Sequence, residues 1–150
     1  MYMKELDLLK KDWKKSEASF EQVSEKDIYA FVDKEALKKI LSNLFNNAIK
    51  YSEKKVIVSL IRDEKKLKLT VKNDGNMIPS HLKDKIFEPF FRVENMDNNS
   101  GTGIGLSLAH SLTQLHNGSL QLVFSEPEMN VFELIMPLHQ EEEFMLYDEQ

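Results

Sequence analysis

Apolar residues recur with helical periodicity in three segments of the chain. In residues 34–51 they form one narrow stripe, preceded by Asp33, a residue type that favours helix N-caps. The members of this stripe are Leu37, Leu41, Leu44 and Ala48. Similar spacing predicts a helix over residues 3–15 and another over about residues 104–116. The leucines of the last helix, which are expected on its buried side, are Leu108, Leu112 and Leu115.

Alternation of apolar and polar residues predicts strands in the remaining segments. Residues 56–61 and 66–72 flank a charged turn and form a hairpin, and the lysines of the second strand are expected on its solvated face. Two more short strands are predicted near the N-terminus, over residues 19–23 and 28–32. The last pair is expected to bury Leu120, Leu122 and Phe124 on one strand and Phe132, Leu134 and Met136 on the other. The pattern therefore mixes helices with a largely antiparallel sheet.

Composition narrows the class of protein. The chain has 150 residues, 41% of them hydrophobic and 30% charged, which is typical of a folded domain. It has no cysteine, so disulfides, thiol nucleophiles and zinc ribbons are excluded. Residues 139–150 carry five acidic and no basic side chains, so the remaining 20 acidic and 20 basic residues balance. We therefore expect one domain over residues 1–138 with an acidic tail or linker, no binding of nucleic acid, and no membrane contact by this domain.

Two polar features suggest where chemistry takes place. Asn43, Asn47 and Lys50 share one stripe of the predicted helix 34–51, beside its apolar face. Three of only five glycines lie within residues 101–105, directly before the helix that begins near residue 104. Backbone N–H groups at such a helix start can bind phosphate. The glycine spacing matches neither a Walker A loop nor a dinucleotide-binding fingerprint.

Four segments, taken in order along the chain, resemble the sequence boxes of sensor histidine kinases. Residues 43–52 (NLFNNAIKYS) resemble the N box, 73–79 (NDGNMIP) the G1 box, 86–92 (IFEPFFR) the F box and 101–106 (GTGIGL) the G2 box. The resemblance covers about residues 20–138. It is to the catalytic ATP-binding domain of these kinases, within the superfamily of gyrase, chaperone, histidine kinase and MutL ATPases. It implies an α+β fold, a two-layer α/β sandwich of the Bergerat type, with a mixed, mostly antiparallel sheet packed on about three helices and a flexible ATP lid.

The resemblance also implies roles for individual residues. Asn47 is expected to bind Mg²⁺, while Asn43 and Arg92 are expected to act in catalysis. The expected contacts with ATP come from Asn47, Lys50, Tyr51, Asn73, Asp74, Gly75, Ile78, Gly101, Thr102, Gly103, Ile104, Gly105 and Leu106. The implied cofactors are thus ATP and Mg²⁺, and the implied enzyme is a histidine protein kinase.

Three positions bear on how far this resemblance extends. ATP-hydrolysing members of the superfamily have a glutamate where this chain has Asn43, so the resemblance favours phosphotransfer over hydrolysis. Asn73 stands where the family has an aspartate that accepts from the adenine amine. Loss of that charge-assisted bond predicts roughly tenfold weaker ATP binding, unless Asp74 contacts the base instead. Met77 replaces a glycine and is expected near the base.

None of the four histidines lies in the sequence context of a phosphoacceptor histidine. We therefore expect the chain to phosphorylate a histidine on a separate dimerisation hairpin of its parent kinase, which would then serve a response-regulator receiver domain. The domain is expected in the cytoplasm, within a parent that is a membrane-anchored sensor kinase, either hybrid or not. The alternatives are an ATP-hydrolysing relative, a serine kinase of the anti-sigma type, and a docking domain that no longer binds nucleotide.

Overall fold

The computed structural model describes residues 19–24, 32–93 and 103–138. The helix predicted for residues 3–15, most of the strand predicted for 28–32 and the acidic tail 139–150 lie outside the described residues. None of the helices in the described part of the chain is long and apolar enough to cross a membrane.

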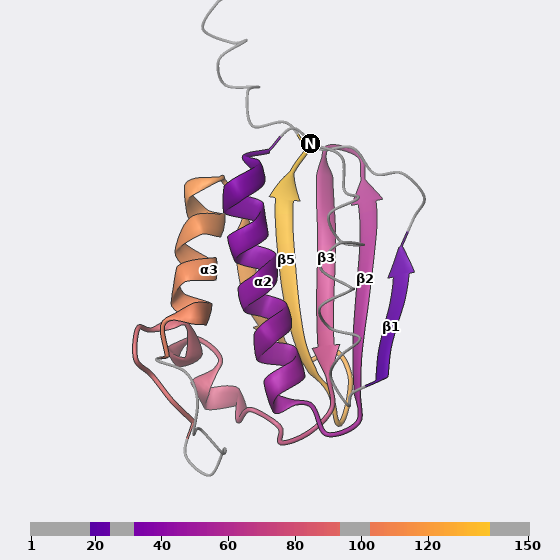
Figure 1. Ribbon diagram of the computed structural model, residues 1–150, viewed down its shortest axis with the longest axis vertical. Helices are drawn as coiled ribbons and strands as arrows, with labels where there is room; N and C mark the ends of the chain where they lie inside the picture. The colour runs from indigo at the N-terminus through magenta and orange to yellow at the C-terminus, as the bar shows by residue number, and fades with distance from the viewer. Residues whose placement is uncertain (1–18, 25–31, 94–102, 139–150) are drawn as a thin grey trace, which may run out of the picture.

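In the described part of the chain, five strands form one mixed sheet (Figure 1). They are β1 (Ser19–Ser24), β2 (Lys55–Asp63), β3 (Lys66–Asn73), β4 (Ser119–Val123) and β5 (Asn130–Pro137). Their order in the sheet is β1-β2-β3-β5-β4, with β1 parallel to β2 and every other pair antiparallel. The prediction of a mixed, mostly antiparallel sheet is therefore confirmed.

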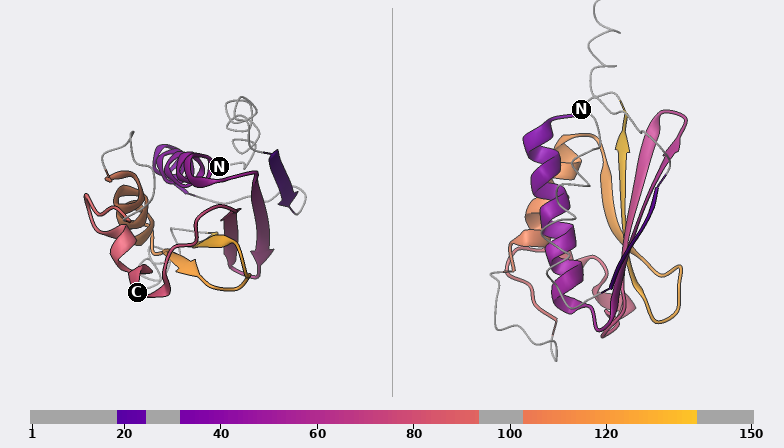
Figure 2. Two further views of the ribbon diagram at one scale, coloured as in Figure 1. Left: turned by 90° about the horizontal axis from the view of Figure 1, so that it is seen from below. Right: turned by 45° about the vertical axis from the view of Figure 1, so that its right-hand side comes forward.

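Two α-helices, α2 (Lys34–Tyr51) and α3 (Gly105–Leu115), cover one face of the sheet and make the second layer (Figure 2). Helix α2 begins where Asp33 accepts a hydrogen bond from the Ala36 N–H (3.1 Å), as an N-cap should. Two single 3-10 turns, Ser80–Leu82 and Lys85–Phe87, follow β3. The result is the expected α/β sandwich.

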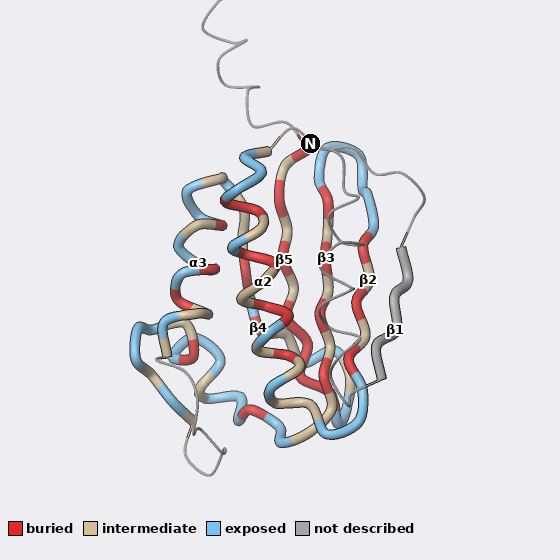
Figure 3. Tube along the Cα trace, viewed as in Figure 1, coloured by how far each residue is buried: buried red, intermediate tan, exposed pale blue. Residues whose placement is uncertain are grey.

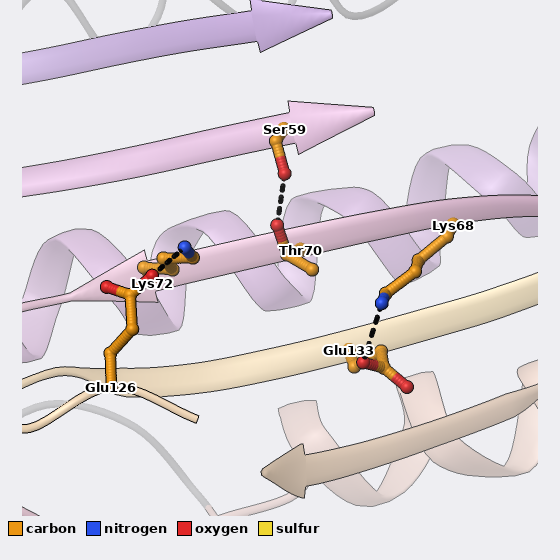
Figure 4. Close-up of polar contacts among 6 residues, drawn as sticks. All are labelled: Ser59, Lys68, Thr70, Lys72, Glu126 and Glu133. Atoms are coloured by element: carbon orange, nitrogen blue, oxygen red, sulfur yellow. Dashed lines mark hydrogen bonds and ion pairs between the residues drawn. The ribbon is translucent and has the colours of Figure 1, made fainter. Parts of the chain in front are cut away.

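The core fills the space between the two layers (Figure 3). The predicted apolar stripe of α2 is fully buried, and so are the inward residues of β5. The opposite face of the sheet mixes polar and apolar side chains, since Ile57, Ile61 and Val131 lie there beside the lysines of β3. Figure 4 shows cross-strand pairs there between Ser59 and Thr70, and between Lys68 and Glu133, whose charged atoms lie 3.4 Å apart. The lysines of β3 therefore form a solvated face, as expected.

The face of α3 that packs against the core differs from the prediction. Leu108 is 40% exposed and Leu115 is 76% exposed, while Leu112 is partly buried. The buried positions are instead Ser107, Ala109 and Thr113. Small side chains allow a close approach to α2, and Thr113 satisfies its hydroxyl by donating to the Ala109 carbonyl (2.7 Å). The leucine spacing located the helix correctly and was right for Leu112, but it was wrong for Leu108 and Leu115.

Strand β4 also ends one residue earlier than predicted. Its last residue is Val123, and Phe124 lies beyond it with an exposed ring. The alternation of Leu120 and Leu122 continues to Phe124 in the sequence. The pairing of β4 with β5 stops at Val123 and Val131, so Phe124 has no partner strand that would hold it in the sheet.

Candidate functional site

A pocket of about 420 Å³ opens between α2, the start of α3 and the ends of β3 and β5. Its walls combine amides, two cations, small residues and apolar side chains. They are Asn43, Asn46, Asn47, Lys50, Tyr51, Asn73, Ile78, Ile86, Phe91, Arg92, Val93, Gly103, Gly105, Leu106, Asn130 and Phe132. Among the described residues, none that lines the pocket is acidic. The two cations of this wall, Lys50 and Arg92, suit an anionic ligand.

Helix α2 supplies one wall through its polar stripe. The Asn43 side-chain NH₂ donates to the Lys39 carbonyl (2.9 Å), so its orientation is set from within the helix. Its other end, Oδ1, faces the start of α3, since a Cβ added to Gly105 would lie 3.0 Å from it. Asn47 lines the pocket, and its side chain has no hydrogen-bond partner among the described residues. Asn46 is exposed and also borders the pocket.

The two cations of the lining come from the end of α2 and from the loop before the undescribed residues 94–102. Lys50 stands at the end of α2, with its ammonium 5.1 Å from the centre of the Tyr51 ring, a cation–π contact. Arg92, the last residue of the F box segment, is exposed and lines the pocket. Both cations are long, exposed side chains that can reach a phosphate.

Two buried asparagines form the far end of the pocket. Asn73 is 1% exposed and Asn130 is 2% exposed, and they face each other in the register of β3 and β5. Asn130 Oδ1 accepts from the Ile78 N–H (2.9 Å), while its NH₂ donates to the Asn76 carbonyl (2.9 Å). Asn130 thus holds the loop after β3 against β5. The sequence interpretation missed it because its role depends on a strand pairing between distant segments.

Asp74 lies outside the pocket lining. Its Oδ1 accepts from the N–H groups of Glu53 (3.0 Å), Lys54 (2.9 Å) and Lys55 (3.0 Å). Burial alone would raise the pKa of Asp74. The three backbone donors and the charge of Lys55 outweigh burial, and the pKa lies below its ordinary value. The Asp74 carboxylate therefore fastens the end of β3 to the loop after α2, and of these two neighbours Asn73 lines the pocket.

Three further expected positions also lie away from the lining. Gly75 has φ of +114° and a Cβ there would lie 2.3 Å from the Tyr51 carbonyl oxygen, so the backbone path requires glycine. Met77 is exposed and absent from the lining, and its φ is not positive, so its backbone has no need of the family's glycine. Ile104 is exposed beside the pocket without lining it.

The backbone of the glycine segment approaches the backbone of the F box segment closely at Gly103 and Phe90. Gly103 has φ of +75°, and a Cβ there would lie 2.9 Å from the Phe90 Cα. The Phe90 N–H donates to the Gly103 carbonyl (3.0 Å), and Phe90 itself has φ of +65°. Gly103, Gly105 and Leu106 all line the pocket, whereas Gly101 and Thr102 lie outside the described residues.

Comparison with known proteins places this pocket in a family. Residues 32–140 match the family described as "Histidine kinase-, DNA gyrase B-, and HSP90-like ATPase". The sensor histidine kinase CssS of Bacillus subtilis is 34% identical over 110 residues, which cover 73% of this chain and 24% of CssS. The chain therefore spans about a quarter of the length of that relative.

Solved structures agree. The catalytic domain of histidine kinase ThkA superimposes with a TM-score of 0.75 at 29% identity, covering 89% of this chain and 88% of that one. A second ThkA structure, in complex with the response regulator protein TrrA, gives a TM-score of 0.76 at 25% identity and covers 95% of this chain and 42% of that one. The chain belongs to the histidine kinase-, DNA gyrase B- and HSP90-like ATPase family, as the catalytic ATP-binding domain of a sensor histidine kinase.

Proposed function

We propose that this domain binds Mg-ATP in the pocket and transfers the γ-phosphoryl group to a histidine on a separate dimerisation hairpin of its parent kinase. The observation that carries the proposal is the composition of the pocket wall. It offers five amides and two cations, and none of its described residues is acidic. Such a wall stabilises phosphate charge, while its described residues supply no carboxylate that could deprotonate water.

The pocket suits a nucleotide along its whole length. Its far end is buried and partly apolar, with Ile78 and Phe132 beside Asn73, which fits a flat base. Its near end carries Lys50 and Arg92 and the backbone of residues 103–106 at the start of α3, which fits phosphates. The base therefore lies toward β3 and β5, and the phosphates lie toward the two cations.

Asn47 fits the role of a magnesium ligand. Its amide is unpartnered among the described residues and lines the pocket between the base end and the cations. Magnesium commonly takes one or two protein oxygens and completes its shell with water and phosphate oxygens. When bound, the ion would neutralise charge on the phosphates. With a single amide oxygen from the protein, Mg²⁺ binds together with the nucleotide rather than alone.

Phosphotransfer to histidine agrees with the chemistry of Asn43. An amide oxygen can accept a hydrogen bond but cannot take a proton at neutral pH. Hydrolysis requires such a base to activate water. A neutral imidazole already has a lone pair for attack on the γ-phosphorus, and ADP leaves as the β–γ bond breaks. The wall of the pocket therefore favours transfer over hydrolysis.

The transfer can be tested with the domain and a separate substrate. Mix the purified chain, Mg²⁺ and γ-labelled ATP with a purified dimerisation hairpin from the parent kinase, and follow label on the hairpin. We expect an acid-labile, alkali-stable phosphate on the hairpin that disappears when its histidine is replaced by alanine. Label that is stable to acid would indicate a serine acceptor, and label released only as free phosphate would indicate hydrolysis.

The ThkA–TrrA complex supports a response regulator as the next partner. We propose that the phosphoryl group passes from the hairpin histidine to a receiver domain, and that residues 139–150 link this domain to a further domain of the parent protein.

A further inference from the structure

The side chain of Asn73 presents only one of its two ends to the pocket. Its NH₂ donates to the Asp74 main-chain carbonyl (2.9 Å), and its Oδ1 has no partner among the described residues. The residue is 1% exposed and lines the pocket. A buried acceptor without a partner is costly unless a ligand satisfies it.

The carbonyl that fixes Asn73 is itself held in place. The Asp74 carboxylate accepts the three N–H groups of residues 53–55, and the Asp74 N–H donates to the Lys55 carbonyl (3.3 Å). The main chain at Asp74 is thus fastened on two sides. If the Asn73 amide turned over, its Oδ1 would face the Asp74 carbonyl oxygen, two acceptors in contact. The bonds of Asp74 therefore oppose that rotation.

We propose that Asp74 is a positioning residue that locks Asn73 as a hydrogen-bond acceptor, and that this lock makes the pocket select an adenine base over a guanine base without a carboxylate. The inference rests on the proposed nucleotide site and specifies how that site reads the base. Adenine presents an exocyclic amine, a donor, at the edge where guanine presents a carbonyl, an acceptor. The locked Oδ1 pairs with the first and opposes the second.

The neighbouring amide does not relax this selection. Asn130 faces Asn73 across the two strands, but its Oδ1 and its NH₂ both bind the backbone of residues 76–78. Among the described residues, no acidic side chain lines the pocket that could read the amine instead. Selection at this edge therefore depends on the orientation of one neutral amide.

The test compares binding of Mg-ATP and Mg-GTP by the whole chain and its variants, using calorimetry. The chain is expected to bind ATP at least about tenfold more tightly than GTP, because a buried acceptor facing a second acceptor costs on the order of one hydrogen bond. Asp74→Ala should bring the ratio of ATP affinity to GTP affinity close to one, because the freed amide can turn its NH₂ toward guanine. The affinity for ATP itself should fall by a smaller factor than this ratio does. Asp74→Asn keeps an acceptor for residues 53–55 and should restore the ratio. Asp63→Ala, at the opposite end of the β2–β3 hairpin, is the control and should change nothing.

A melting curve for each variant confirms that it is folded. If Asp74→Ala does not fold, Asn73→Ala replaces it, and it should also bring the ratio close to one. The proposed role of Asp74 would be overturned if the wild type bound ATP and GTP equally well. It would also be overturned if either alanine variant kept the wild-type ratio of ATP affinity to GTP affinity. Neither result would contradict Mg-ATP binding. Failure of the wild-type chain to bind Mg-ATP at all would overturn the proposed function and the lock together.

Discussion

The chemistry of this pocket depends on amides whose two ends have different partners. Asn43 is held by the Lys39 carbonyl, Asn73 by the Asp74 carbonyl and Asn130 by the backbone at both of its ends. The bonds of Asn43 and Asn73 each engage the NH₂ group and leave Oδ1 without a partner among the described residues, whereas both ends of Asn130 are engaged. Asn47 differs because its amide has no partner among the described residues, which leaves its oxygen available to a metal ion.

The Asn47→Ala variant should lose magnesium-dependent nucleotide binding and keep its fold. The side chain lies on the polar stripe of α2, while the stability of the helix comes from the buried leucines on its other face. Titration of ATP with Mg²⁺ and with a chelator, together with a melting curve, measures both effects. The metal role would be refuted if the variant bound Mg-ATP with the affinity of the wild type.

The Asp74 carboxylate should make the stability of the domain depend on pH in the acidic range. Its pKa is lowered in the folded state, so its contribution is fully present above the unfolded value of about 3.9 and is lost as the pH falls through the folded value. The difference in free energy of unfolding between wild type and Asp74→Asn should therefore be constant above about pH 5 and shrink on acidification. Urea unfolding at a series of pH values measures this difference, and a difference that grows at low pH would contradict the assignment.

At the level of elements, the sequence located the helices and strands better than it located their buried faces. The bounds of α2 agree with the prediction to the residue, because its N-cap and its leucine stripe are both local signals. The prediction for α3 was wrong at Leu108 and Leu115, because the helix buries Ala109 and Thr113 while those two leucines stay exposed. Hydrophobic periodicity does not detect a helix face that buries small side chains.

Substitutions in α3 should show which of its faces packs. Ala109→Leu should destabilise the domain by about 1–3 kcal/mol, because added methylenes must fit between α3 and α2. Leu115→Ala should cost less than about 0.5 kcal/mol, as expected for an exposed side chain. Chemical denaturation measures both values. A larger loss of stability for Leu115→Ala than for Ala109→Leu would show that α3 packs through its leucines instead.

The whole molecule brings together residues that are far apart in the chain. The four boxes are recognisable in the sequence, so the fold and most of the pocket wall could be expected from the residues alone. The role of Asn130 could not, because it depends on the pairing of β3 with β5, which places Asn130 opposite Asn73. The roles of Asn73 and Asp74, adjacent in sequence, were separable only once the partners of each side chain were known.

The central claim is that an amide-rich pocket without acidic lining residues in the described chain holds Mg-ATP without hydrolysing it. Phosphorus NMR of ATP and Mg²⁺ with the isolated chain tests both halves in one measurement. We expect the three ATP signals to shift or broaden as protein is added. We expect no signal of inorganic phosphate to grow during the time in which an ATP-hydrolysing relative would complete several turnovers. Unchanged ATP signals would show that the pocket does not bind the nucleotide, and steady growth of inorganic phosphate would show that it hydrolyses ATP; either result would contradict the account.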